Sequence, residues 1–124
     1  FANSSDYKNG IAIPEIFLPN FKIAPSGSVL MCIEGGSAGR KFGQTDRDVC
    51  FGNKLCCFSS FGGYQRYLYY YIQSPSFVES FQKNKTGIIG GVSVNSLKNL
   101  LIAIPPIEEQ VRIAQHVAEI LSFL

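Results

Sequence analysis

The sequence predicts a mixed α/β domain, in which a small, twisted and mostly antiparallel sheet packs against helices. Three observations favour this fold class. Short apolar runs bounded by glycine and proline, which are typical of strands, occupy the first half of the chain. Between residues 64 and 81, aromatic and apolar residues recur at a spacing of three and four, as they do in helices. The chain ends in an apolar run, a double proline and a long amphipathic segment, which predicts a final helix.

The composition is that of one globular domain with a modest core. The chain has 124 residues, of which 46% are hydrophobic and 16% charged. It contains neither a signal peptide nor an apolar run long enough to span a membrane. Because it begins at Phe1 and ends within a helix that has no capping signal, we expect it to be a fragment of a longer protein.

The net charge of +2 is unevenly distributed along the chain. Residues 39–101 contain eight cations and three anions, a net charge of +5, whereas residues 102–124 contain one cation and three anions, a net charge of −2. The first 38 residues contain two cations and three anions, a net charge of −1. A basic middle beside an acidic end favours a polyanion partner for the middle and a protein partner for the end.

The first strands are expected between turns. Residues 11–13 and 16–18 are short apolar runs in a loop-rich region, and Pro25-Ser26-Gly27 signals a turn. Residues 28–33 form a nearly continuous apolar run, which predicts a strand buried on both faces.

A glycine-rich loop follows at residues 34–45, where four glycines lie within nine residues. It is not a Walker phosphate loop, because Lys41 is not followed by serine or threonine. One interpretation is a plain hairpin turn. The other is a loop that faces DNA, in which Arg40 and Lys41 meet phosphates or guanine edges and Gln44 reads an adenine.

Two more strands are expected at residues 48–51 and 55–58, on either side of Gly52-Asn53-Lys54. Asn53 and Lys54 suit a bulge or a turn. At the edge of a sheet they also suit contact with a base and a phosphate, and the sequence leaves both interpretations open.

Two helices are expected after a linker at residues 59–63. The first buries one face made mostly of tyrosines: Tyr64, Tyr67, Leu68, Tyr71 and Ile72. A stacking platform for single-stranded nucleic acid is the alternative interpretation of these rings. The second helix starts at Pro75 with Ser74 as its cap, and buries three residues: Phe77, Val78 and Phe81.

The second helix is expected to end in a polar, basic segment that is closed by a glycine cap at Gly87. Lys83 and Lys85 lie where cations complement the dipole of that helix. A short capped helix is expected at residues 93–100, and an apolar strand is expected to follow it at residues 100–104.

The final helix has Pro106 in its first turn and two glutamates where the helix dipole favours negative charge. Two apolar stripes run along it. One contains Ile107, Val111, Ala114, Ala118 and Leu121, and the other contains Ile113, Val117, Ile120 and Leu124. Together they are wider than a two-stranded seam needs, so we expect packing on the domain and on a second long helix. An ordinary core helix is the alternative.

No catalytic constellation is recognisable in the sequence, and we expect no cofactor. His116 lies among polar residues of the final helix, and no Cys forms a CxxC pair, so no metal site is expected. The four cysteines are expected to be buried, reduced thiols, which suits a cytoplasmic protein: Cys32, Cys50, Cys56 and Cys57.

The run Ile-Pro-Pro-Ile-Glu-Glu-Gln-Val-Arg-Ile at residues 104–113 precedes a long helix and resembles the exit from a target recognition domain in the specificity subunit of a type I restriction–modification enzyme. The resemblance covers the chain from about residue 22 onward and is most specific at residues 86–113. It implies a DNA-binding target recognition domain at residues 1–104 and the start of a coiled-coil-like spacer helix at residues 105–124.

The resemblance implies sequence-specific recognition of duplex DNA by a non-catalytic chain that directs methyltransferase and endonuclease subunits. A second specificity domain is a possible partner through the spacer helix, and no membrane is involved. The candidate DNA contacts are polar or cationic and lie in loops, turns or a helix exit: Ser37, Arg40, Lys41, Gln44, Asn53, Lys54, Lys83 and Lys85.

Three other functions stay open. The chain is alternatively the recognition domain of a single-chain restriction–methylation enzyme, or a protein-interaction module that uses only its final helix. An enzyme whose catalytic residues are distant in sequence is the third alternative.

Overall fold

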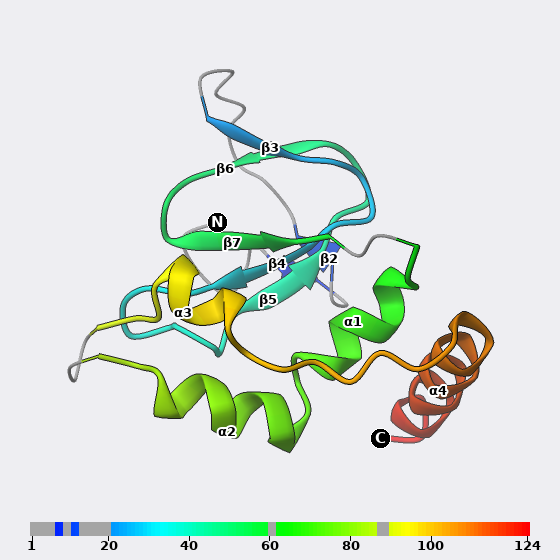
Figure 1. Ribbon diagram of the computed structural model, residues 1–124. Coiled ribbons are helices and arrows are strands. Elements are labelled where there is room, and N and C mark those ends of the chain that lie inside the picture. The colour runs from blue at the N-terminus through cyan, green and yellow to red at the C-terminus, as the bar shows by residue number, and fades with distance from the viewer. Residues whose placement is uncertain (1–6, 9–10, 13–20, 60–61, 87–89) are drawn as a thin grey trace.

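The computed structural model describes residues 7–8, 11–12, 21–59, 62–86 and 90–124. Within these residues the chain forms seven strands and four helices (Figure 1). The strands are β1 Tyr7–Lys8, β2 Ile11–Ala12, β3 Lys22–Ala24, β4 Val29–Cys32, β5 Phe42–Gln44, β6 Val49–Phe51 and β7 Leu55–Phe58. The helices are α1 Gln65–Tyr71, α2 Pro75–Lys83, α3 Val94–Lys98 and α4 Ile107–Leu121. The apolar run expected at residues 16–18 and the cap expected at Gly87 lie outside the described residues.

The strands form two sheets, and the predicted fold class is confirmed. A five-stranded sheet has the order β1-β2-β5-β4-β7, and β3 pairs with β6 in a separate two-stranded sheet. All strand pairs are antiparallel except β2 with β5. β4 is an interior strand because it pairs on one side with β5, Leu30 opposite Gly43, and on the other side with β7, Leu30 opposite Cys57.

The side chains of β4 enter two separate cores, as the apolar run predicts. Val29 and Met31 pack with the buried residues of the helices on one face of the sheet. Leu30 points the other way and packs with Ala24 and Val49 of the two-stranded sheet. Successive residues of a strand face opposite sides, so only a strand covered on both faces is apolar at every position.

Helices α1 and α2 cover the first of these faces (Figure 1). Tyr67, Leu68 and the C-cap residue Ile72 are buried as predicted. Tyr64 and Tyr71 are only half-buried. Tyr69 is buried although it lies outside the predicted face, with its ring centroid 6.1 Å from that of Phe42. The predicted buried face of this helix is incomplete, because α1 packs against the sheet with one side and against α4 with another.

Ser74 caps α2 as predicted. Its Oγ accepts a hydrogen bond from the backbone N–H of Phe77 at 3.3 Å. We expect Ser74→Ala to lower the free energy of unfolding by about 1 kcal/mol, because one N–H of the first turn loses its partner. Urea denaturation measures this loss. Ser76→Ala in the same turn is the control, and an equal loss in both variants would contradict the role of the cap.

The predicted strand at residues 100–104 is wrong. Residues 101–106 have no regular secondary structure and join neither sheet. The backbone groups of Ala103 are bound by tyrosine side chains instead: its carbonyl accepts from the hydroxyl of Tyr67 at 2.6 Å, and its N–H donates to the hydroxyl of Tyr71 at 3.2 Å. Leu101 and Ile104 are 91% and 74% exposed, so this segment does not have the buried side chains of a core strand.

Helix α4 packs against α1 through part of its surface. Of the first predicted stripe, Ala114 is buried and Val111 half-buried, whereas Ile107, Ala118 and Leu121 are exposed. The last turns of α4 therefore leave their apolar residues in solvent. In Figure 1, α4 lies at the edge of the molecule beside α1, away from α3 and the end of β4.

Candidate nucleic-acid interface

Three segments meet at the C-terminal end of β4. Backbone hydrogen bonds join Cys32 to Gly39 and Lys41, each at 2.8 Å. The N–H of the next residue, Ile33, donates to the carbonyl of Lys54 at 2.9 Å, and its carbonyl accepts from Val92 at 2.8 Å. Two consecutive residues thus hold the loop after β4, the turn after β6 and the segment before α3 together.

The first segment is the glycine-rich loop, which is folded tightly onto α2. Gly35 and Gly39 have φ angles of 84° and 76°, a left-handed conformation that favours glycine. A Cβ atom on Gly39 would lie 2.8 Å from the ring of Phe81, so any larger residue there would force the ring to shift. The loop therefore places Arg40, which is exposed, and Lys41, which is half-buried, at a fixed position over α2.

The second segment is the turn at residues 52–54, in which the N–H of Leu55 donates to the carbonyl of Gly52 at 3.2 Å. Asn53 and Lys54 are exposed in this turn. The turn interpretation is confirmed, and it is compatible with contact to a ligand because both side chains are accessible to solvent.

The third segment, which precedes α3, begins at the exit from α2. The helix ends at Lys83 with Asn84 as its C-cap, and the N–H of Thr86 donates to the carbonyl of Gly91 at 3.2 Å. Lys83 pairs with Glu79 at 3.2 Å, one helical turn earlier, and Lys85 is half-buried.

Seven of the eight predicted DNA contacts belong to these three segments. We call this group the basic end, and it comprises Ser37, Arg40, Lys41, Asn53, Lys54, Lys83 and Lys85. Residues far apart in the sequence are brought to one end of the sheet because their backbones are anchored on Cys32 and Ile33, directly or through Gly91 and Val92. A net positive surface of this kind attracts a polyanion.

Gln44 lies elsewhere, at the opposite end of β5. Its side-chain amide donates to the carbonyl of Gly27 at 3.2 Å and accepts from the guanidinium of Arg66 at 3.1 Å. Arg66 in turn lies 4.3 Å from the ring centroid of Tyr69 and 5.0 Å from that of Tyr70. Gln44 thus has protein partners for both ends of its amide, and contact between this residue and DNA stays a prediction. Nothing in the local sequence signals the contact between Arg66 and Gln44.

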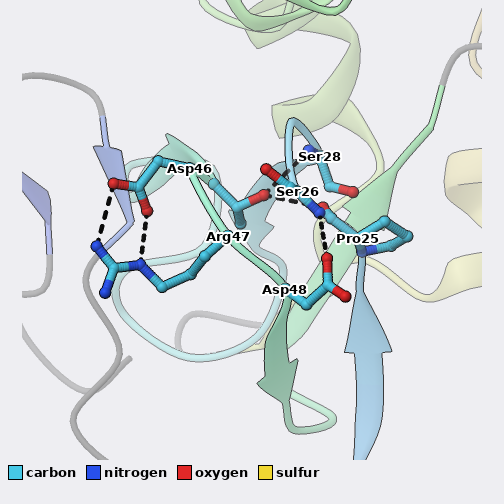
Figure 2. Close-up of polar contacts among 7 residues, drawn as sticks. Pro25, Ser26, Ser28, Asp46, Arg47 and Asp48 are labelled. Carbon is cyan, nitrogen blue, oxygen red and sulfur yellow. Dashed lines mark hydrogen bonds and ion pairs between the residues drawn. The ribbon is translucent and has the colours of Figure 1, made fainter.

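The turn at this opposite end is held by polar contacts (Figure 2). The hydroxyl of Thr45 donates to the carbonyl of Pro25 at 2.9 Å, and the N–H of Ser26 donates to Asp48 at 2.8 Å. Arg47 donates to Asp46 at 2.9 Å, which lowers the pKa of that exposed carboxyl. The predicted turn at Pro25-Ser26-Gly27 is confirmed, and the cation beside it, Arg47, is paired with a carboxylate of the protein.

The described residues contain no group of three or more metal-ligating side chains. All four cysteines are free thiols, of which Cys32 is buried and the others are half-buried. Burial raises the pKa of Cys56, which makes its reactive thiolate scarce. Within the described ranges, no helix has the length and apolar character needed to cross a bilayer.

No curated protein matches the sequence of this chain. One similar structure is described as showing the structural basis of complex assembly and conformational transition of the type I R-M system. A chain of it superposes on this chain with a TM-score of 0.76 at 21% sequence identity, over 95% of this chain and 29% of that one. The HsdS subunit from Thermoanaerobacter tengcongensis superposes with a TM-score of 0.75 at 22% identity, over 96% of this chain and 28% of that one.

These two structures share the fold of this chain, which spans less than a third of the length of either. Residues 1–122 match the family described as the type I restriction modification DNA specificity domain. The match covers nearly the whole chain, including the basic end and α4. The chain therefore belongs to the family of type I restriction modification DNA specificity domains.

Proposed function

We propose that this chain recognises a specific duplex DNA sequence and itself catalyses no reaction. The observation that carries the proposal is the anchoring of three segments with five cations on Cys32 and Ile33, in a domain of this family. Lysine and arginine side chains on loops neutralise phosphates and fix the register of a protein on DNA. Exposed polar side chains beside them, such as Asn53, suit contact with base edges in the major groove.

The chain would direct methyltransferase and endonuclease subunits that carry the catalytic residues. Helix α4 suits contact with these subunits or with a second specificity domain, because its exposed apolar residues lie away from the basic end (Figure 1). Residues 1–104 would then bind DNA, while residues 105–124 would begin the spacer helix. DNA and protein partners would occupy separate parts of the chain and would not compete.

The salt dependence of DNA binding tests this function. We expect the affinity of the full-length protein for duplex DNA to fall linearly with salt on logarithmic axes, because bound cations release counterions from phosphates. Arg40→Ala together with Lys41→Ala is expected to weaken binding at every sequence and to reduce the slope by roughly 1–2. Fluorescence anisotropy over a salt series measures both quantities.

A matched control variant lacks two positive charges that lie outside the basic end. Arg47→Ala together with Arg112→Ala changes the net charge equally, but each arginine is already paired with a neighbouring carboxylate. We expect this variant to keep the wild-type slope. Equal losses in both double variants would mean that net charge alone governs binding. Affinity independent of salt would favour a module that acts only through α4.

A further inference from the structure

We propose that Glu34 determines sequence specificity by accepting a hydrogen bond from the exocyclic amino group of a cytosine or an adenine in the major groove. The inference rests on the proposed DNA-binding function and assigns a role to a residue with the opposite charge to the rest of the site. Glu34 directly follows Ile33, the residue on which two of the three basic segments are anchored.

Glu34 lines a hollow of about 410 Å³ between these segments. Asn53 and Ser93 line the same hollow, so a carboxylate, an amide and a hydroxyl border one concave surface. Gly91 lies so close to the backbone of Ile33 that a Cβ atom would be 2.0 Å from its carbonyl oxygen. The chain there needs glycine for this close approach, which brings the segment before α3 against the backbone of Glu34.

The charge of Glu34 opposes non-specific DNA binding. Its side chain is exposed, and it forms no ion pair with any side chain in the part of the chain that the structure describes. Glu79, the other carboxylate near the basic end, is instead paired with Lys83. An unpaired carboxylate beside a phosphate backbone repels it, so Glu34 weakens binding to every sequence that offers it no donor.

A base with an amino group reverses this penalty. Cytosine presents its N4 amino group and adenine its N6 amino group in the major groove, whereas guanine and thymine present only acceptors there. A carboxylate accepts hydrogen bonds but cannot donate them. Glu34 therefore favours a base pair that places an amino group against it and disfavours one that places an acceptor there, which is specificity obtained by repulsion as well as by attraction.

The position of Glu34 is fixed by its backbone surroundings. The thiol of Cys32 donates to the carbonyl of Glu34 at 3.3 Å, and Ile33 is bonded to both Lys54 and Val92. Gly35, the next residue, holds a φ of 84° that turns the chain away. A reader held in this way needs little ordering when DNA binds, which favours discrimination between bases.

Selection from a random-sequence duplex library tests the inference with the full-length protein. We expect the wild type to enrich a sequence that includes one position restricted to cytosine or adenine on one strand. In Glu34→Ala, preference at that position should fall by roughly 5- to 150-fold, the range for one good base contact. Affinity for a duplex that lacks the selected sequence should rise at the same time. Glu34→Gln should instead tolerate guanine or thymine there, because an amide also donates.

Glu119→Ala is the matched control, because it removes one exposed carboxylate from α4 and should leave the selected sequence unchanged. Glu34→Ala selecting the full wild-type sequence with unchanged preference would overturn the role of Glu34 and leave the proposed function intact. Wild-type protein that binds no duplex in the library would overturn both. Circular dichroism of each variant excludes loss of fold as the cause.

Discussion

Gly39→Ala is expected to lower the free energy of unfolding by about 2–5 kcal/mol. An alanine in the left-handed conformation, at the φ of 76° found here, costs about 1–2 kcal/mol. The added Cβ would also lie 2.8 Å from the ring of Phe81, which is 1% exposed and has little room to move. Overpacking of this kind costs about 1–3 kcal/mol.

The loss in Gly39→Ala is measured by urea denaturation beside Gly36→Ala. Gly36 lies in the same loop, has no left-handed φ, and no atom lies within 4 Å of a Cβ built on it. We therefore expect Gly36→Ala to change stability by less than about 0.5 kcal/mol. A similar cost for both substitutions would show that the loop is not held against α2.

A double-variant cycle separates the two causes of the cost at Gly39. In a Phe81→Leu background the ring is absent, so Gly39→Ala should cost only about 1–2 kcal/mol, the backbone part. An undiminished cost of Gly39→Ala in this background would show that the contact with Phe81 does not contribute to the loss of stability. Because the loop carries Arg40 and Lys41, DNA affinity of Gly39→Ala should also fall under conditions where the domain stays folded.

Gln110→Leu is expected to lower the free energy of unfolding by about 2–4 kcal/mol and to loosen the attachment of α4. Gln110 is only 4% exposed, and its side chain joins α4 to Tyr64 and to Pro105. Its oxygen accepts from the N–H of Tyr64 at 3.0 Å, and its nitrogen donates to the carbonyl of Pro105 at 2.8 Å. Leucine has a similar volume but leaves both groups without their partner. Because Tyr64 and Pro105 are half-buried, each loss should cost about 1–2 kcal/mol, the lower part of the range for a buried group.

Urea denaturation gives the global effect of Gln110→Leu, and hydrogen exchange of the α4 amides reports local opening. Gln115→Leu is the control, because Gln115 is exposed on the same helix and its replacement should matter little. Exchange in α4 that is as slow in Gln110→Leu as in the wild type would show that apolar packing around Ala114 alone holds the helix. The attachment of α4 at Gln110 matters for function because the direction of this helix sets where a partner bound to it would lie.

The structure also shows which predictions from the sequence failed and why. The apolar run at residues 100–104 has the composition of a strand, yet Ala103 bonds to the hydroxyls of Tyr67 and Tyr71. These partners are 36 and 32 residues away, so no local pattern signals them. Gln44 follows the glycine-rich loop in the sequence, which predicts a place beside Arg40 and Lys41, but β5 carries it to the other end of the strand, where it bonds to Gly27.

The sequence by itself determined the features that arise from interactions over a few residues. These are the doubly buried strand β4, the cap at Ser74, the amphipathic helices and the segment around Pro105-Pro106 that carries the family resemblance. The tertiary structure alone decided which distant segments meet: the basic end at Cys32 and Ile33, the contact of Arg66 with Gln44, and the joint at Gln110. Periodicity and capping depend on neighbours in the chain, whereas these contacts depend on how the sheet and helices pack, which a single sequence does not display.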